Sequence, residues 1–402
     1  MTNATAEISP AEELPEASAF PPHRAKIAGS DWFDYQAVVA GDDVAQRQLQ
    51  ALRESLASVV SADQLVILAG LGTSLGLQRS TADGEAEDVA APTMGTLFTE
   101  IAKLAGFEQA SVIAPDSIER GDVEGLLSAC QFQLALNGDP DISRFVRDAE
   151  AVILSLCSFI DGTTDLISHE VFLRKIARRQ TRLSRTQVFT TNYDLAFEQA
   201  AERIRFHVID GFGFGNQRAF DGSSFDMDIV RRRRGETLML EPNVFHLLKL
   251  HGSVDWDEED GEVRRVSMPR NPVLIYPSQD KYQLSFRPPY LESMSRFQMA
   301  LRQPDVTLVV VGFGFNDAHI VAPIEAAIRS NIGLRVVVVG PELSTTGNAT
   351  VQRLQRLLAS GDRRITLVET TFREFSSLLP DTSPQDDREL HDDRAASVWA
   401  SK

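Results

Sequence analysis

Hydrophobic residues along this chain gather in short continuous runs, separated by stretches in which they recur at the three- and four-residue spacing of helices. A short and almost fully apolar run is typical of a strand that is buried on both faces, because helices cover both sides of a parallel sheet. Strands that alternate with helical segments predict an α/β protein built on a parallel sheet. The predicted strands are 65–70, 187–192, 245–253, 306–313, 335–340 and 364–369.

The helical spacing predicts an amphipathic helix before the first strand, at 43–61. A loop at 82–92 then leads into a block of helices, which we expect to pack beside the sheet. The helices of this block are predicted at 93–106, 123–136, 141–160 and 165–180. Further helices are expected at 193–204, from the turn at 312–317 through Ile328, and at 371–379.

Both ends of the chain are polar and charged and lack apolar periodicity, so residues 1–30 and 381–402 are predicted to be disordered tails. Between them, residues 31–380 are expected to form one domain with a helical insertion at about 93–180 and a loop-rich insertion at about 205–245. Acids and prolines stand where a secretory signal would have basic and then apolar residues, and no apolar run approaches the roughly 20 residues that span a bilayer. We therefore expect a cytoplasmic protein without a membrane segment.

Charge and cysteine content narrow the function classes. The net charge of −17 argues against nucleic-acid binding by the whole surface, although a local basic groove is compatible with it. The one concentrated basic run, Arg231 to Arg234, is either a solvated loop or a contact with a phosphate backbone or an acidic partner. The two cysteines, Cys130 and Cys157, cannot form a four-cysteine zinc site, and we expect both to be core residues with no metal bound.

The first candidate motif directly follows the first predicted strand. Glycines at such a position allow the backbone to turn tightly and approach a pyrophosphate, while the next amides and hydroxyls donate to it. A strict dinucleotide fingerprint would have glycine where Leu75 stands, and no ribose-binding acid is identifiable after the second strand. A tight turn between a strand and a helix is the alternative interpretation. The candidate phosphate-binding residues are Gly70, Gly72, Thr73 and Ser74.

Two further motifs place polar side chains at the ends of predicted strands. Thr190 to Asp194 ends one strand and opens a helix, so Asn192 and Asp194 either contribute to a site or only stabilise the helix start. Lys249 to Ser253 places His251 beside a glycine that admits a ligand, and a histidine there can serve as a general base near neutral pH. A structural core histidine is the alternative.

The fourth motif runs from Gly312 to Asp317 and opens another predicted helix. It is either a glycine-rich turn with a helix cap or a second wall of a nucleotide site, formed by Gly312, Gly314, Asn316 and Asp317. The remaining histidines have no second ligand at metal spacing and are assigned to structure or surface. They are His169, His207, His246 and His319, with His23 and His391 in the tails.

Together these four elements, each at the end of a strand, resemble the sirtuin-like family that includes bacterial defence NAD hydrolases. The most specific segments are TTNYD at 190–194 and KLHGS at 249–253, the latter followed by Trp256. The resemblance covers about residues 60–380 and includes IYPS at 275–278 and PYLESMSRF at 289–297. It implies a Rossmann-like parallel sheet of the sirtuin type with an added helical subdomain.

The resemblance also implies an activity, which is cleavage of NAD⁺ to ADP-ribose and nicotinamide with NAD as substrate and without zinc. Asn192 would orient a water molecule or the ribose hydroxyls, His251 would accept a proton, and Asp194 would support the site. The turn at 70–74 would hold phosphates, and Gly312, Asn316 and Asp317 would border the adenosine half. Because the chain cannot build the four-cysteine zinc module of deacylating sirtuins, water is the expected acceptor rather than an acyl-lysine peptide.

An NAD hydrolase needs an inactive state, so the resemblance further suggests a homo-oligomer or a triggering partner such as a hexameric HerA-type translocase ATPase. The acidic tails and residues 211–243 are candidate contact regions. Three competing functions remain open: an NAD or ADP-ribose sensor without turnover, a nucleic-acid-processing subunit, and a zinc-independent deacylase or ADP-ribosyltransferase.

Overall fold

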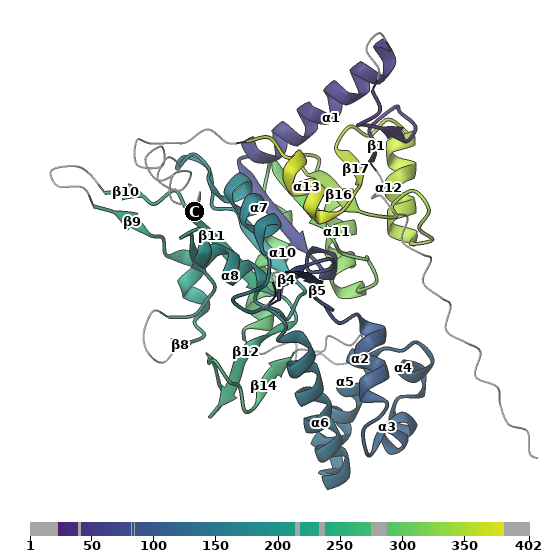
Figure 1. The fold of residues 1–402 in the computed structure, drawn as a ribbon, viewed down its shortest axis with the longest axis vertical. Coiled ribbons are helices and arrows are strands. Elements are labelled where there is room, and N and C mark those ends of the chain that lie inside the picture. Colours follow the sequence, from purple (N-terminus) through teal and green to yellow (C-terminus); the bar gives the residue numbers. More distant parts are fainter. Residues whose placement is uncertain are drawn as a thin grey trace, which may run out of the picture.

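A nine-stranded sheet forms the centre of the computed structural model, which describes residues 23–38, 42–81, 83, 85–213, 218–232, 238–274 and 288–381 (Figure 1). Its seven strands from β17 to β7 are parallel, and β1 and β2 extend the sheet through antiparallel pairings of β1 with β17 and of β2 with β1. The strand order is β2 (Phe33–Asp34), β1 (Arg24–Lys26), β17 (Ile365–Glu369), β16 (Arg335–Gly340), β15 (Val306–Val311), β3 (Gln64–Ala69), β6 (Gln187–Thr190), β11 (Val244–Lys249) and β7 (His207–Ile209). All six predicted strands contribute to this sheet, and the predicted α/β class with a Rossmann-like sheet is confirmed.

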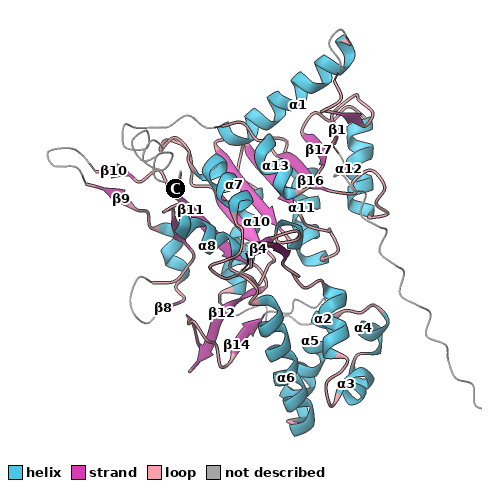
Figure 2. Ribbon diagram, in the orientation of Figure 1, coloured by secondary structure: helices cyan, strands magenta, loops and turns pink. Residues whose placement is uncertain are grey.

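Helices cover both faces of the sheet, and alternate strand residues supply the two cores (Figure 2). In β3, for example, Leu65 and Ile67 face one core while Val66 and Leu68 face the other. The first face is covered by α1 (Asp43–Ser61), α7 (Ile167–Ala177), α8 (Ala196–Arg203) and α13 (Phe372–Leu378). The second face is covered by α10 (Tyr290–Leu301), α11 (Ala318–Ser330) and α12 (Ala349–Ala359).

A separate helical block lies beyond the carboxyl edge of the strands (Figure 1). It consists of α2 (Met94–Ile101), α3 (Phe107–Ile113), α4 (Pro115–Glu119), α5 (Val123–Asn137) and α6 (Pro140–Cys157). The block has its own core, in which Cys130 and Cys157 are buried as predicted. Val254 and Leu274 also contribute to that core, so the block is anchored on neighbouring strands.

Two predicted boundaries of this block are wrong. The single helix predicted at 93–106 ends at Ile101, and a new helix begins after Gly106, whose φ of 90° belongs to the left-handed region. The insertion was expected to extend to about 180, but α7 packs on the sheet instead, because its apolar face includes Phe172 and Leu173 of the first core. The helical block therefore ends at Cys157.

Short strands occupy segments that the sequence predicted as loops. The loop predicted at 82–92 contains β5 (Ala86–Asp88), which pairs with β4 (Gln78–Ser80). The loop-rich insertion predicted at about 205–245 begins with β7 of the main sheet and continues through β8 (Arg218–Ala219), β9 (Val230–Arg231) and β10 (Met239–Leu240). A four-stranded sheet joins β8 to β14 (Pro272–Leu274), β12 (Gly252–Glu259) and β13 (Glu262–Arg265). Gly252 and Ser253, predicted to end a main strand, belong to this second sheet.

The N-terminal tail predicted at residues 1–30 extends too far along the chain. Residues 24–26 form β1, which pairs with β17, and Arg24 lies 2.5 Å from the buried carboxylate of Glu369. A strand of three residues, held by pairing with β2 and β17, is too short to show an apolar periodicity that could reveal it. Residues 1–22 and 382–402, where the remainder of both predicted tails falls, lie outside the described residues. None of the described helices is long and apolar enough to cross a membrane.

The fold includes a buried histidine whose protonation opposes folding. His169 is completely buried between the rings of Phe197 and Phe372, and burial lowers its pKa to about 3. In the unfolded chain a histidine titrates near 6.5, so its contribution to stability is complete above that pH and is lost as the pH falls toward the folded-state pKa. When the pH is lowered from 7.5 to 4.5, we expect the free energy of unfolding of His169→Leu to fall by about 2 kcal/mol less than that of the wild type.

Urea unfolding at both pH values measures this difference. The exposed His207 provides the control, since His207→Leu should show the acid sensitivity of the wild type. Equal acid sensitivity in His169→Leu and the wild type would contradict the expectation.

Candidate functional site

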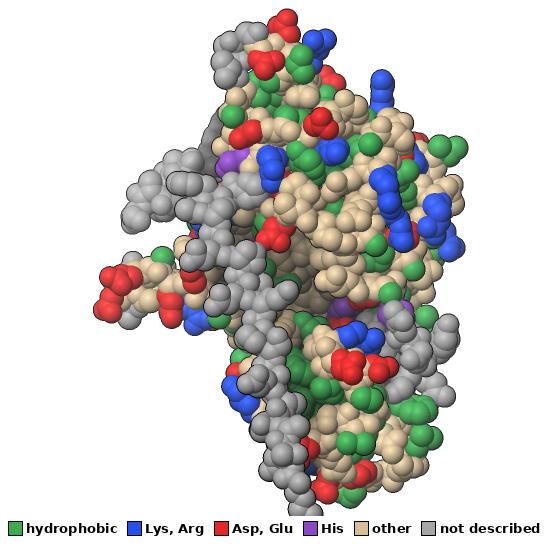
Figure 3. Space-filling view, turned by 90° about the vertical axis from the view of Figure 1, so that its right-hand side faces the viewer, with side chains coloured by type: hydrophobic (Ala, Val, Ile, Leu, Met, Phe, Trp, Pro, Cys, Tyr) green, Lys and Arg blue, Asp and Glu red, His purple; other side chains and the backbone are tan. Residues whose placement is uncertain are grey.

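A deep cleft lies at the carboxyl edge of the main sheet, between the sheet and the helical block (Figure 3). Its volume is about 2270 Å³, and its walls come from the turns after β3, β6 and β15 and from α2 and the segments around α4 and α5. Parallel α/β sheets bind ligands outside the carboxyl ends of their strands. The position of this cleft agrees with that rule. The predicted site residues that line it are Gly72, Thr73, Asn192, Asp194, His251, Gly312, Gly314, Asn316 and Asp317, whereas Gly70 and Ser74 lie behind its surface.

The glycines of the first and fourth motifs contact one another. A Cβ atom on Gly72 would lie 2.6 Å from the Cα of Gly312, and one on Gly70 would lie 2.6 Å from the carbonyl oxygen of Gly312. The amide of Gly72 donates to that same oxygen at 2.8 Å. The turns after β3 and β15 therefore touch backbone to backbone, and this crossing by itself requires glycine at Gly70, Gly72 and Gly312.

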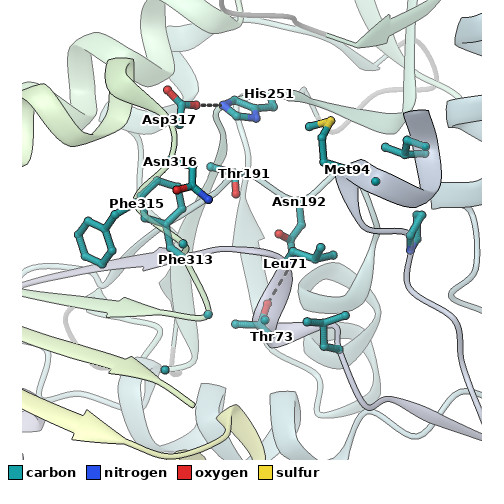
Figure 4. Close-up of a pocket in the computed structure, with 18 of the residues that line it drawn as sticks. Leu71, Thr73, Met94, Thr191, Asn192, His251, Phe313, Phe315, Asn316 and Asp317 are labelled. Atoms are coloured by element: carbon teal, nitrogen blue, oxygen red, sulfur yellow. Dashed lines mark hydrogen bonds and ion pairs between the residues drawn. The ribbon is translucent and has the colours of Figure 1, made fainter. Parts of the chain in front are cut away.

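Beyond this crossing, the fourth motif offers main-chain donors to the cleft. The backbone N–H groups of residues 313–316 donate to no other group among the described residues. Gly314 and Asn316 are exposed at the cleft, and Asn316 lies beside Phe313 and Phe315 in the wall (Figure 4). Unpaired amides at the beginning of a helix are suited to an anionic ligand.

Asn192 lies at the floor of the cleft and is held by the first motif. Its amide nitrogen donates to the hydroxyl oxygens of Thr73 at 3.2 Å and Ser74 at 3.1 Å (Figure 4). The hydroxyl of Ser74 in turn donates to Asp194 at 2.8 Å, and that of Thr73 donates to the carbonyl of Gly70 at 2.9 Å. In this arrangement the two hydroxyls that were expected to bind phosphate instead orient the second motif.

A buried charge network holds the second motif from behind. The ammonium group of Lys249 donates to the carbonyl oxygens of Tyr193 and Asp194 and lies 3.1 Å from the carboxylate of Glu198. Asp194 also accepts from the amide of Ala196 at 3.0 Å, which fixes the start of α8. Asp194 thus performs the helix-start role that the sequence left open, and it reaches the cleft as well.

His251 is buried at the cleft wall, where it faces Asp317 (Figure 4) and a second carboxylate from another part of the fold. Its Nε2 lies 2.8 Å from Asp317, and its Nδ1 lies 3.4 Å from Glu124, which α5 of the helical block carries. Burial would lower the pKa of His251, but the charge of Glu124 and the hydrogen bond to Asp317 outweigh burial and raise this pKa to about 10. The imidazole is therefore held as a cation in this arrangement.

Asp317 has a different neighbourhood from the one expected for a residue bordering adenosine. One carboxylate oxygen caps α11 by accepting from the amide of His319 at 2.9 Å, and the other faces His251. Burial raises the pKa of Asp317, but the hydrogen bond and charge of His251 exceed this effect and lower it. Ligand atoms of Glu124, His251 and Asp317 lie within 4.8 Å of one another, so the three side chains form one compact cluster at the cleft wall.

Glu124 is the site residue that sequence reasoning missed. It follows the cap Asp122 in the first turn of α5, where an acid is ordinarily explained by the helix dipole. Its carboxylate also accepts from the hydroxyl of Tyr193 at 3.3 Å. No spacing or motif in the sequence connects the helical block to His251, and only the fold brings the two together.

The sheet and the cleft at its carboxyl edge define an α/β protein of the Rossmann-like class. A family model described as the SIR2-like domain matches residues 186–359, which include Asn192, His251 and the turn at 312–317. Residues 186–359 therefore carry a SIR2-like domain, as the motifs predicted, and this domain implies NAD-related chemistry. A comparison with curated proteins finds no match.

Proposed function

We propose that this protein is an NAD⁺ glycohydrolase, which converts NAD⁺ and water to ADP-ribose, nicotinamide and a proton. The observation that carries the proposal is that Asn192, His251 and the turns at 70–74 and 312–317 meet at one cleft in a SIR2-like chain. Asn192 and His251 thus line the same cleft. The segment IYPS at 275–278, which also contributed to the resemblance, lies outside the described residues.

The cleft fits a dinucleotide in size and in the chemistry of its walls. Ligand sites of ~300 to ~1,000 Å³ hold drug-sized molecules, so about 2270 Å³ is ample room for NAD⁺. The unpaired amides at 313–316 suit the pyrophosphate. Since the hydroxyls of Thr73 and Ser74 are engaged by Asn192, the fourth motif is the stronger candidate for phosphate binding.

Cleavage breaks the bond between C1′ and nicotinamide and builds positive charge on the ribose, and a water oxygen then bonds to C1′. Asn192 is rigidly held at the cleft floor and can orient the water or the ribose hydroxyls by its amide. His251, once unprotonated, can accept the proton that the water loses. The carboxylate of Asp317 lies where it favours positive charge in this part of the cleft.

One observation favours a second candidate function, binding of NAD or ADP-ribose without turnover. Both nitrogens of His251 face carboxylates, so the imidazole cannot accept a proton in this arrangement. A sensor would bind the nucleotide and keep it intact. The experiment below separates the two functions.

Purified protein should release nicotinamide from NAD⁺, and both His251→Ala and Asn192→Ala should lower the rate by ~100- to ~10,000-fold, the usual range for acid–base and positioning groups. Chromatography of nicotinamide and ADP-ribose between pH 6 and 10 measures the reaction. Circular dichroism of each variant verifies that the fold persists. Tight nucleotide binding with no nicotinamide release across that pH range would replace hydrolysis by the sensor function.

We further propose that depletion of NAD⁺ by this enzyme serves bacterial defence against phage. This part depends on the hydrolase activity and on the sirtuin-like resemblance, in which such effectors occur. A homo-oligomer or a HerA-type translocase ATPase would then supply the trigger, and nucleic acid would be sensed through that partner. Of the basic run, Arg231 pairs with Glu241 at 2.6 Å, while Arg233 and Arg234 lie outside the described residues.

A further inference from the structure

The helical block contacts His251 through the carboxylate of Glu124. Glu124 is carried by the first turn of α5, its Oε1 lies 3.4 Å from Nδ1 of His251, and Asp317 occupies the opposite nitrogen. The block is inserted between β3 and β6 and has a core of its own. A change in the position of this block would therefore act directly on the imidazole.

We propose that Glu124 is a positioning residue that locks His251 in a resting arrangement, and that the site reacts only when this carboxylate moves away from the imidazole. The inference rests on the proposed hydrolase function and adds its regulation. It requires no new reactant, because the lock consists of an ion pair and, once the pair opens, the imidazolium gives its extra proton to solvent water and becomes the base form.

The surroundings of His251 make Glu124 the movable side of this lock. Asp317 is fixed because it also caps α11, at 2.9 Å from the amide of His319. Tyr193 contributes only its ring and a hydroxyl that donates to Glu124. Among the residues that the structure describes, Tyr290 of α10 is another titratable group beside this cluster, and burial together with the charges of Asp317 and Glu124 raises its pKa to about 12, so it is neutral.

The lock also explains how a general base could be present and yet silent. With the pKa of His251 raised to about 10, nearly all of the imidazole is protonated at neutral pH. An opposite charge at this distance typically shifts a pKa by about 1 to 3, and each unit that the pKa falls increases the unprotonated fraction tenfold. Removing the charge of Glu124 should therefore activate the protein near neutral pH.

Glu124→Gln provides the test, because glutamine keeps the length of the side chain and can still accept from Tyr193. In the full-length protein, we expect the pKa of His251, followed by NMR of ¹⁵N-labelled histidine and assigned with His251→Ala, to fall by about 1 to 3. Nicotinamide release at pH 7.5 should rise by about tenfold or more, and the acid limb of the pH profile should move to lower pH by the same amount as the pKa. Glu119→Gln is the matched control, because Glu119 is an exposed acid at the end of α4 in the same block.

The outcomes separate the lock from the proposed function. An unchanged His251 pKa in Glu124→Gln overturns the lock, and so does a fall in activity at every pH, which would make Glu124 a group that assists the reaction. If the pKa of His251 falls in Glu124→Gln but no variant releases nicotinamide, the contact between Glu124 and His251 is supported and the proposed hydrolase function is refuted. Equal effects of Glu119→Gln and Glu124→Gln would also overturn the lock.

Discussion

Replacement of Gly312 by alanine is expected to lower the free energy of unfolding by about 2 to 5 kcal/mol. Two costs add at this position. The φ of 64° is left-handed, which costs an alanine about 1 to 2 kcal/mol, and its Cβ would lie 2.6 Å from the backbone nitrogen of Thr73, so the two turns would be forced apart. Because the same turns form the cleft floor, NAD⁺ binding should be lost together with stability.

Two other glycines separate these costs. Gly72→Ala introduces a clash of the same kind without a left-handed backbone, since its Cβ would lie 2.6 Å from the Cα of Gly312. Gly361→Ala introduces only the backbone strain, because its φ is 91° and nothing lies within 4 Å. Thermal and urea unfolding should rank Gly312→Ala as the most destabilised and Gly361→Ala as the least. A loss in Gly312→Ala no greater than in Gly361→Ala would show that the turns can separate freely.

Lys249→Met is expected to lower the free energy of unfolding by about 3 to 5 kcal/mol, the usual result of removing one partner of a buried ion pair. Lys249 is only 4% exposed and its ammonium group has four oxygen partners, one of them the carboxylate of Glu198. Without the ammonium group, that carboxylate is left buried and unpaired, and the carbonyl oxygens of Tyr193 and Asp194 lose a donor. The segment that carries Asn192 should then lose its fixed position, so nicotinamide release should fall as well.

The double variant Glu198→Gln with Lys249→Met tests this explanation by removing both charges. We expect it to recover part of the lost stability, since only the neutral hydrogen bonds remain missing. Lys103→Met is the surface control, because Lys103 and its partner Glu100 are exposed and their pair contributes less than about 1 kcal/mol. If the double variant is as unstable as Lys249→Met alone, the stability that Lys249→Met loses comes from packing and not from the unpaired charge.

Much of the sheet could be predicted from the sequence because its strands are buried on both faces. A continuous apolar run such as 306–311 carries that information locally. Edge and hairpin strands carry less, since β1 and β5 are held by pairing with a neighbour rather than by apolar burial. The sequence pattern therefore predicted the centre of the fold and missed its margins.

The candidate site divides in a similar way. Asn192 and His251 could be predicted to meet because both follow strands of one parallel sheet, and residues at carboxyl ends share an edge. Glu124 could not be predicted, because its position depends on how a separate helical block packs against that edge. The partners of Thr73 and Ser74 were hidden for the same reason, since their hydroxyls meet Asn192 across more than a hundred residues of chain.

The strand order has a practical consequence for dissecting this protein. The segment that the family model matches, 186–359, begins after β3, yet β3 is hydrogen-bonded between β15 and β6 in the middle of the sheet. A fragment cut to the matched boundaries would lack this central strand as well as β17, and would present newly bare edges of β6, β15 and β16 to any neighbouring copy. A soluble truncation must therefore start upstream of Gln64, and insolubility of a shorter one would reflect the missing strand rather than a defect in the domain.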